Sequence, residues 1–318
     1  MNFGYTRGQG IGIRLASVSE IVSSSLQVSI SPDVSLHVQR FRTESATVPV
    51  LLLHGLVEDG RIFYSRTGKG FAPWLAAQGF DVFVPDIRAH GASTPELKPG
   101  LEVSQRQVIT EDIPALLEMI DSFYPGQRLF LGSHSWGGVW LASALIRQPH
   151  WLPRVAGMVH FACKRVIHQR GFRRRLMIDL LWARVAGLIG RFKGYIPARA
   201  LGAGSEDESC RMHRDNLDWI RGREWRDLED GFDYALQLDQ LNWPPSLYLA
   251  GSKDRYLGHF DDVKAFAREL GKHDAQIVLL EKGTGCARHY GHNDLLTHAQ
   301  AEEDHFPLVL AWLDQHYT

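Results

Sequence analysis

From Val48 onwards the chain repeats one pattern, an uninterrupted apolar run of strand length followed by a stretch with helical periodicity. The apolar runs are VPVLLLHG, FDVFVPDI, RLFLGS, VAGMVHF, SLYLAGS and QIVLLE. Strands without polar alternation are buried on both faces, and their alternation with helices is typical of a parallel sheet wrapped by crossover helices. The helices are expected at 70–78, 111–123, 136–147, 260–270 and 302–316. We therefore predict an α/β fold with a mostly parallel central sheet flanked by helices.

Two departures from this rhythm indicate the domain organisation. Before Val48, the alternating runs SLQVSI and VSLHVQRF are separated by the turn-forming letters SPD, which predicts a hairpin that begins the sheet antiparallel. Between 164 and 240, helix-like sequence continues without a strand candidate. We predict a catalytic domain formed by 1–163 and 241–318, with a helical cap inserted at 164–240. A length of 318 residues suits one such domain with one insertion.

Composition and charge exclude several classes of protein. With 44% hydrophobic and 22% charged residues, the chain has enough apolar material for a sheet buried on both faces. The net charge of −1 provides no global field that would attract nucleic acid, so we expect a small-molecule partner. The three cysteines, Cys163, Cys210 and Cys286, lack the spacing of a zinc site and are expected to be free thiols in a reducing compartment. No stretch has the apolar length of a signal peptide or a membrane span, so we expect a cytoplasmic protein.

Ser135 lies where a predicted buried strand turns into a predicted helix, within RLFLGSHSWGGVWLASALI. A serine on such a sharp turn projects its hydroxyl above the carboxyl ends of the strands, and small neighbours let strand and helix approach. Ser133 and Gly137 are these neighbours, although the first place is more often glycine. A serine between small residues is a weak signal alone, and the strand-turn-helix context strengthens it. We predict Ser135 as a nucleophile, which requires a histidine and a carboxylate further along the chain.

Asp254 is the candidate for the orienting acid. The strand SLYLAGS ends directly in KDRYLG, which places Asp254 just beyond the carboxyl edge of the sheet. Asp261 and Asp262 are rivals, but they fall at the amino end of the next helix, where the helix dipole favours carboxylates. We expect both rivals to be structural.

Position selects one of the fifteen histidines as the general base. His292 lies in the loop between the last predicted strand and the final helix, within HYGHND. His289, three residues earlier, is the main competitor. His298, His305 and His316 lie closer to the final helix or on it, and we expect them to be solvated.

The segment VLLLHGLVED follows the pattern of a loop that supplies main-chain donors. The backbone N–H of Leu56 could join that of Trp136 to form an oxyanion hole for a tetrahedral intermediate. His54 is expected to support this loop structurally, because the downstream histidine already fills the role of base.

Five motifs, in this order, resemble the α/β-hydrolase superfamily across nearly the whole chain: HGL at 54–56, PDIRAHGAS at 85–93, SHSWGG at 133–138, GSKD at 251–254 and YGH at 290–292. The resemblance implies an active site between the sheet and the cap, acyl-enzyme chemistry, no cofactor and structural roles for Asp86 and Arg88. The stretches KGFAPWLAAQGFDVFVPDIRAHG and RHYGHNDLL look similar to lipase-like and polyester-metabolising branches. Serine at 135 favours hydrolysis over polymerisation, which uses cysteine there, and over halide chemistry, which uses aspartate.

The predicted cap begins with a basic amphipathic pattern. From 164 to 193 there are nine lysines and arginines against one acid, Asp179, and an apolar series runs at helical spacing through Leu181, Val185, Leu188, Ile189 and Phe192. Such a helix can make weak contact with a lipid surface or lie over an acyl substrate. We favour the alternative in which its apolar face packs on the sheet domain and its arginines pair with the acidic stretch 206–230.

The leading hypothesis for function is hydrolysis of a carboxylic ester, with Ser135 as nucleophile, His292 as base and Asp254 as the orienting acid. An acyl transferase would use the same triad and exclude water from the acyl-enzyme. A non-catalytic binding module is the third hypothesis, and the ordered set of three residues argues against it. We expect neither a metal nor a cofactor.

Overall fold

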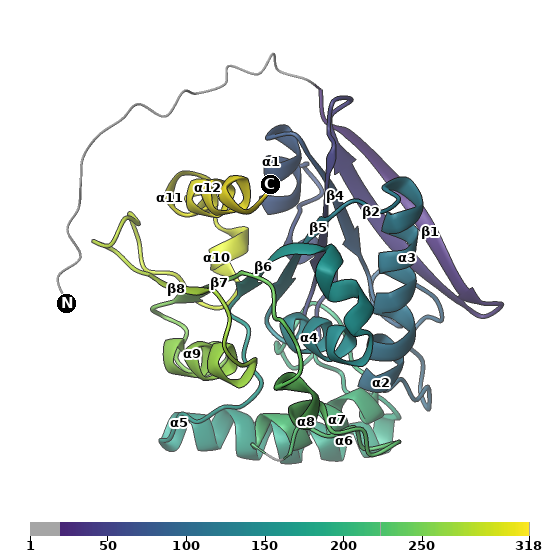
Figure 1. Ribbon diagram of the computed structural model, residues 1–318. Coiled ribbons are helices and arrows are strands. Elements are labelled where there is room, and N and C mark those ends of the chain that lie inside the picture. The colour runs from purple at the N-terminus through teal and green to yellow at the C-terminus, as the bar shows by residue number, and fades with distance from the viewer. Residues whose placement is uncertain (1–19, 223, 318) are drawn as a thin grey trace.

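The computed structural model describes residues 20–222 and 224–317, and its centre is an eight-stranded sheet (Figure 1). The strands are β1 (Val22–Ser31), β2 (Val34–Arg42), β3 (Val48–Leu53), β4 (Phe80–Pro85), β5 (Leu129–His134), β6 (Val155–Phe161), β7 (Ser246–Gly251) and β8 (Ala275–Leu280). Their order across the sheet is β1-β2-β4-β3-β5-β6-β7-β8. β2 is antiparallel to both β1 and β4, and all other neighbours are parallel. The predicted hairpin and the six predicted parallel strands are thus confirmed.

Helices cover both faces of the sheet. On one face lie α1 (Phe71–Ala77), α10 (Asp294–Thr297), α11 (Ala301–Asp304) and α12 (Phe306–His316), and on the other α3 (Ile113–Phe123), α4 (Gly137–Arg147) and α9 (Phe260–Glu269). Shorter pieces are η1 (Gly60–Ile62), α2 (Gln105–Gln107), the π-helical η2 (Val108–Asp112) and η3 (Pro149–Arg154). Because both faces are covered, every residue of β4, β5, β6 and β7 is buried.

The expected helix at 302–316 is interrupted at His305, between α11 and α12. Pro307 lies in the first turn of α12, where its missing N–H is tolerated, but it cannot continue a preceding helix. The His305 side chain is buried, and its Nε2 lies 2.7 Å from the carbonyl oxygen of Leu295. The expectation that His305 is solvated is therefore wrong.

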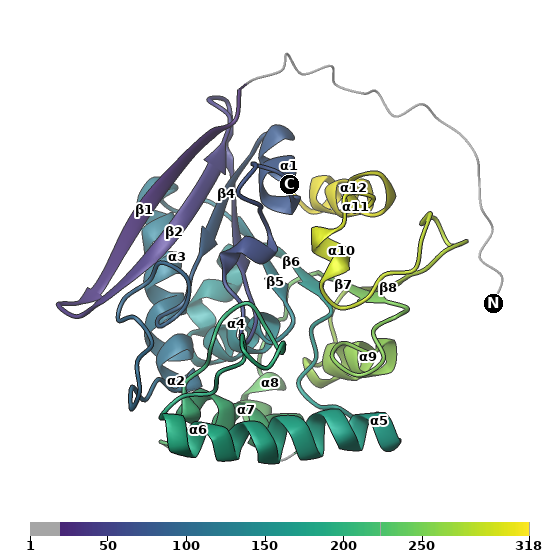
Figure 2. The ribbon, with the colours of Figure 1, turned by 180° about the vertical axis from the view of Figure 1, so that it is seen from behind.

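The segment between β6 and β7 consists of helices and loops. Its helices are α5 (Phe172–Arg174), the π-helical η4 (Arg175–Ala186), α6 (Gly187–Lys193), α7 (Cys210–Ile220) and α8 (Tyr234–Leu238). The first three join end to end into one long helix, here called helix 172–193, which Figure 2 shows running across the bottom of the molecule. Among the described residues, no helix is both long enough and apolar enough to cross a membrane.

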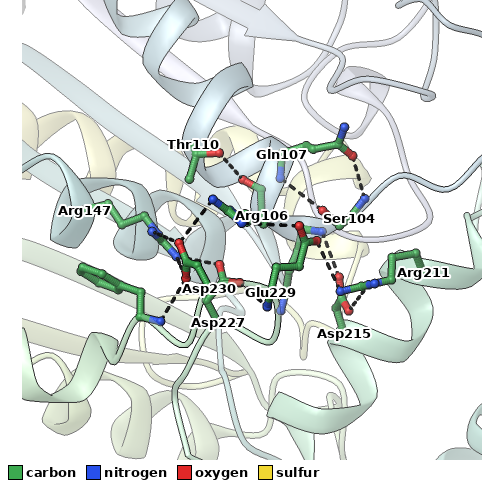
Figure 3. A network of polar contacts seen from close by, with 12 residues as sticks. Ser104, Arg106, Gln107, Thr110, Arg147, Arg211, Asp215, Asp227, Glu229 and Asp230 are labelled. Atoms are coloured by element: carbon green, nitrogen blue, oxygen red, sulfur yellow. Dashed lines mark hydrogen bonds and ion pairs between the residues drawn. The ribbon is translucent and has the colours of Figure 1, made fainter.

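A network of arginines and carboxylates connects this segment to α2 and α4 (Figure 3). Arg147 of α4 binds Asp227 at 2.7 Å and Asp230 at 2.9 Å, and Arg106 of α2 lies 3.4 Å from Asp230. The acidic stretch therefore pairs here with arginines of these two helices. Within helix 172–193, the ion pair found among the described residues is internal, between Arg174 and Asp179. This corrects the expected pairing of that helix with the acidic stretch.

Candidate active site

The turn after β5 holds Ser135 in a conformation that non-glycine residues seldom adopt. Its φ is +50°, and its backbone N–H donates to the carbonyl of Phe161 on β6 at 2.9 Å. Strained backbone of this kind costs on the order of 1–3 kcal/mol and persists where the surrounding structure imposes it. Gly137, two residues later, packs directly against the loop after β3, because a Cβ there would lie 2.3 Å from the carbonyl oxygen of His54. The close approach of α4 to the end of β3 thus requires glycine and fixes the turn.

The structure places His292 and Asp254 beside Ser135. His292 Nε2 lies 2.9 Å from Ser135 Oγ, and His292 Nδ1 lies 2.5 Å from Asp254 Oδ2. Asp254 follows β7, and its Oδ1 also accepts a hydrogen bond from the N–H of Leu257 at 2.9 Å. The three predicted residues therefore meet at the carboxyl edge of the sheet, each delivered by a different loop.

The charges of this group suit proton transfer. Burial alone would raise the pKa of Asp254, but the charge of His292 and the hydrogen bond to it outweigh burial and lower that pKa to about 2. Burial lowers the pKa of His292, and Asp254 opposes this only in part. A neutral imidazole whose Nδ1–H faces a carboxylate presents the lone pair of Nε2 to the serine hydroxyl. The arrangement can thus accept the Ser135 proton.

The two rival acids are engaged elsewhere. Asp261 lies 2.6 Å from the ammonium of Lys264, one helical turn along α9. Asp262 is buried and accepts a hydrogen bond from the backbone N–H of His168 at 3.0 Å. Both lie in the first turn of α9, where a carboxylate is favoured electrostatically.

The rival histidines also have other partners. His289 Nδ1 lies 2.9 Å from the hydroxyl of Ser252 and makes no recorded contact with the group around Ser135. His54 is fully buried, and its Nε2 accepts a hydrogen bond from the N–H of Ile87 at 3.1 Å while Nδ1 contacts the carbonyl of Gly55 at 2.8 Å. Burial lowers the pKa of His54, so this ring is a neutral connector between two loops.

The two predicted oxyanion-hole donors lie in the loop after β3 and directly after Ser135. Leu56 and Trp136 line the same cavity as Ser135. Within residues 20–222 and 224–317, no acceptor is recorded for the backbone N–H of either residue. Both residues therefore line the cavity of Ser135 and carry a backbone N–H without a competing internal bond, as the predicted oxyanion hole requires.

Ser133 replaces the more usual glycine, and its hydroxyl has a structural use. Its Oγ lies 2.9 Å from His160 Nδ1 and 3.4 Å from the sulfur of Cys163. Burial lowers the pKa of His160 to about 3, so this imidazole is neutral and needs a polar neighbour rather than a counter-ion. The serine at 133 is therefore accommodated beneath the turn, where its hydroxyl contacts His160 and Cys163.

Sequence reasoning missed an ion pair beneath the site. Glu58 Oε1 accepts hydrogen bonds from the N–H of Gly55 at 2.5 Å and from His134 Nδ1 at 2.6 Å, while His134 Nε2 lies 3.0 Å from the carbonyl of His292. Since a carboxylate and a carbonyl can only accept, His134 donates from both nitrogens and is therefore an imidazolium. Burial lowers the pKa of His134, but Glu58 outweighs burial and raises it. One pair thus joins the loop after β3, the serine turn and the loop of His292.

A cavity with a volume of about 800 Å³ opens above Ser135. Its floor includes Leu56, Glu58, Ser135, Trp136 and His292, and its opposite wall is apolar and comes mainly from helix 172–193, with Met177, Ile178, Leu181, Trp182, Val185 and Ala186. Lys164, which follows β6, also lines it and is a further residue that sequence reasoning did not single out. Among the described residues, no group of three or more His, Cys, Asp or Glu side chains could hold a metal ion.

Comparison with known proteins identifies relatives of this fold. A family model described as serine aminopeptidase, S33, matches residues 44–294. A putative aryl esterase from Burkholderia cenocepacia is 18% identical, with a TM-score of 0.58 over 92% of this chain and 100% of that chain. A thermophilic esterase from Thermogutta terrifontis is 17% identical, with a TM-score of 0.56 over 93% and 100%. A carboxylesterase from Bacillus subtilis is 17% identical, with a TM-score of 0.54 over 92% of each chain.

Proposed function

The chain belongs to the serine aminopeptidase, S33, family of α/β hydrolases, and from that premise we propose that it hydrolyses a carboxylic ester of a small molecule through an acyl-enzyme on Ser135. The observation that carries the proposal is the contact of 2.9 Å between His292 Nε2 and Ser135 Oγ, with Asp254 held at 2.5 Å from His292 Nδ1. A hydroxyl becomes an effective nucleophile when an adjacent base removes its proton.

In the proposed reaction, Ser135 Oγ attacks the acyl carbon while His292 Nε2 takes its proton. The carbonyl oxygen becomes negative, and the N–H groups of Leu56 and Trp136 stabilise it. His292 then gives the proton to the leaving alcohol, and the same imidazole later activates the water that releases the acid. Asp254, ionised because its pKa is lowered to about 2, stabilises the imidazolium that forms in both steps.

We also propose that the segment 164–240 is a cap on a catalytic domain formed by 1–163 and 241–318. In support, one wall of the cavity above Ser135 comes from helix 172–193, and that wall is apolar. An apolar wall opposite a polar floor suits an ester with a hydrocarbon part. The substrate that we propose is therefore a small acyl compound, bound between the cap and the sheet.

Replacement of the nucleophile tests the proposal. Ser135→Ala is expected to reduce the hydrolysis of p-nitrophenyl butanoate by at least about 10⁴-fold and to prevent labelling by a fluorophosphonate, with the unfolding temperature unchanged. Ser205→Ala is the matched control, because Ser205 also lines the cavity. Full activity and labelling in Ser135→Ala would reject the assignment.

Two further substrates separate the alternatives within this chemistry. An acyl transferase would convert an added alcohol into a new ester in preference to releasing the acid, which product analysis detects. A peptidase would cleave a p-nitroanilide of an amino acid readily, although it would hydrolyse the matching ester as well, whereas an esterase would leave the anilide almost untouched. We expect the free acid as the main product and negligible cleavage of the anilide.

A further inference from the structure

Lys164 is a buried cation in the wall of the cavity. It lies three residues beyond the end of β6, and only 5% of it is exposed. It lines the cavity together with Ser135, Trp136 and His292. Its ammonium lies 5.7 Å from the centroid of the Trp136 ring. An amino group is thus built into the surface that a bound substrate would touch; burial lowers its pKa, and the charge of Asp254 opposes this, as a bound anion would.

This amino group forms no ion pair in the described part of the chain. Neither a hydrogen bond nor an ion pair is recorded for it within 20–222 and 224–317, whereas the adjacent buried Arg165 binds Glu269 on α9. An unpaired buried charge is costly, and proteins retain such groups mainly where a ligand completes them. Lys164 therefore differs from its neighbour in being available to a ligand.

Three buried carboxylates at or beside the cavity are already engaged by other donors. Asp254 binds His292 and the N–H of Leu257, and Glu58 binds His134 and the N–H of Gly55. Asp59 binds Arg61. None of the three forms an ion pair with Lys164, so an anion bound in the cavity would supply the close partner that Lys164 lacks.

The same cation opposes the proposed chemistry when nothing neutralises it. Burial lowers the pKa of His292, and the positive charge of Lys164 lowers it further. The imidazolium at His292, which forms during both acylation and deacylation, is thus destabilised by Lys164. An anion bound at Lys164 would screen this repulsion at the moment when proton transfer needs it.

We propose that Lys164 binds a carboxylate of the substrate, so that the preferred esters carry a free carboxylate a few bonds from the scissile ester. This inference rests on the proposed ester hydrolysis. It also distinguishes the chain from an aminopeptidase, because an ammonium group of a substrate would be repelled by Lys164 in the same cavity.

Paired esters of equal shape test the inference. The ethyl half-esters of glutaric and adipic acid place a carboxylate on the acyl side, with ethyl pentanoate and ethyl hexanoate as neutral matches. Carboxymethyl butanoate places it on the alcohol side, with ethyl butanoate as its match. Hydrolysis is followed by titration of released acid at constant pH. We expect kcat/KM to be at least about 10-fold higher for the anionic member of one of these pairs.

Lys164→Met removes the charge and keeps the length of the side chain. We expect it to lower kcat/KM for the preferred anionic ester by about 10- to 100-fold, to raise kcat/KM for the neutral match because the repulsion of the His292 imidazolium is removed, and to leave the unfolding temperature unchanged or higher. Lys193→Met is the control, because Lys193 is exposed at the end of helix 172–193. Equal losses for both members of a pair, or no preference in the wild type, would overturn the inference.

The failure of this inference can be told from a failure of the proposed function. If neutral esters are hydrolysed and Ser135 is labelled without any preference for a carboxylate, only the role of Lys164 is rejected. If no ester is hydrolysed, calorimetric titration of the wild type and Lys164→Met with ethyl hydrogen adipate still decides it. Binding that disappears in the variant supports the carboxylate site, and equal or absent binding rejects it.

Discussion

The carboxyl edge of the sheet and helix 172–193 face each other across one cavity, but they are built differently. At the edge, main-chain segments touch so closely that a Cβ on Gly137 would lie 2.3 Å from the carbonyl oxygen of His54. In the helix, Phe172 and Phe192 are 80% and 83% exposed. Dense packing holds atoms within the tolerance that catalysis requires, whereas an element with few buried contacts moves at low cost. The comparison indicates that geometry is fixed on one side of the cavity and adaptable on the other.

One methyl group placed on each side gives the largest expected contrast. Gly137→Ala forces a carbon against main-chain oxygens and is expected to destabilise the fold by about 3 kcal/mol. Gly187→Ala adds the same methyl inside helix 172–193, where the nearest heavy atom, His213 Cε1, would be 3.5 Å away, and is expected to stabilise by about 0.5 kcal/mol. Urea unfolding of both variants measures the difference. Similar destabilisation by the two changes would show that the sides are equally tightly built.

The tightly built side is also the one that sequence patterns describe well. The runs VPVLLLHG and VAGMVHF predict β3 and β6 because burial of a strand on both faces leaves a local, continuous apolar pattern. Ser135 could be proposed because a strand, small residues and a helix follow one another directly. The positions of Asp254 and His292 followed from the same order of strands.

Contacts between distant segments left no such local pattern. Glu58 and His134 are 76 residues apart. Glu58 belongs to the motif that was used to predict the oxyanion-hole loop, and His134 to the motif that was used to predict Ser135 as nucleophile. Lys164 was counted as one of nine basic residues of a helix, but its burial depends on where β6 ends beneath the inserted segment. The acidic stretch was assigned to the nearest basic helix in sequence, whereas Arg147 of α4 reaches it in space.

A buried histidine–glutamate pair joins the sheet edge to the segment between β6 and β7 that also carries helix 172–193, and it gives a pH-dependent contrast. His90 follows β4, and its Nε2 lies 3.2 Å from Glu208 of the inserted segment. Burial lowers the pKa of His90, but the charge and hydrogen bond of Glu208 outweigh burial and raise it to about 9. The pKa of an unfolded histidine is about 6.5. The pair with Glu208 therefore stabilises the fold fully below that pH, and this stabilisation is lost as the pH rises through about 9.

We therefore expect the free energy of unfolding to fall by about 2 kcal/mol between pH 6.5 and 9, and to fall much less in His90→Gln. Urea unfolding at closely spaced pH values measures both slopes. His168→Gln serves as the control, because His168 also contacts a carboxylate, on Asp262, but its side chain is 59% exposed. Parallel slopes in wild type and His90→Gln would contradict the role of the pair.

Removal of one charge beneath the site sharpens the comparison at the edge itself. Glu58→Gln deprives the His134 imidazolium of its counter-ion and loosens the contact of 3.0 Å between His134 and the carbonyl of His292. We expect kcat for p-nitrophenyl butanoate to fall by about 10- to 30-fold with KM nearly unchanged, because the base is displaced while the apolar wall of the cavity is intact. Asp59→Asn is the matched control, since Asp59 lines the same cavity and binds Arg61 instead. Equal losses in the two variants would indicate a general effect of charge.

The smallest effect on the enzyme is expected from the exposed aromatic rings of helix 172–193. Phe172→Ser and Phe192→Ser remove side chains that make few contacts, so each is expected to change the free energy of unfolding by less than about 0.5 kcal/mol and to leave kcat on a short soluble ester unchanged.

Exposed aromatic rings beside arginines are also typical of helices that lie on lipid surfaces. We therefore expect weak co-sedimentation of the wild type with vesicles that contain an anionic phospholipid, reduced in the double variant. Absence of binding in the wild type would assign these rings to solvent alone, and a loss of activity in the double variant would show that the helix holds the cavity as rigidly as the sheet does.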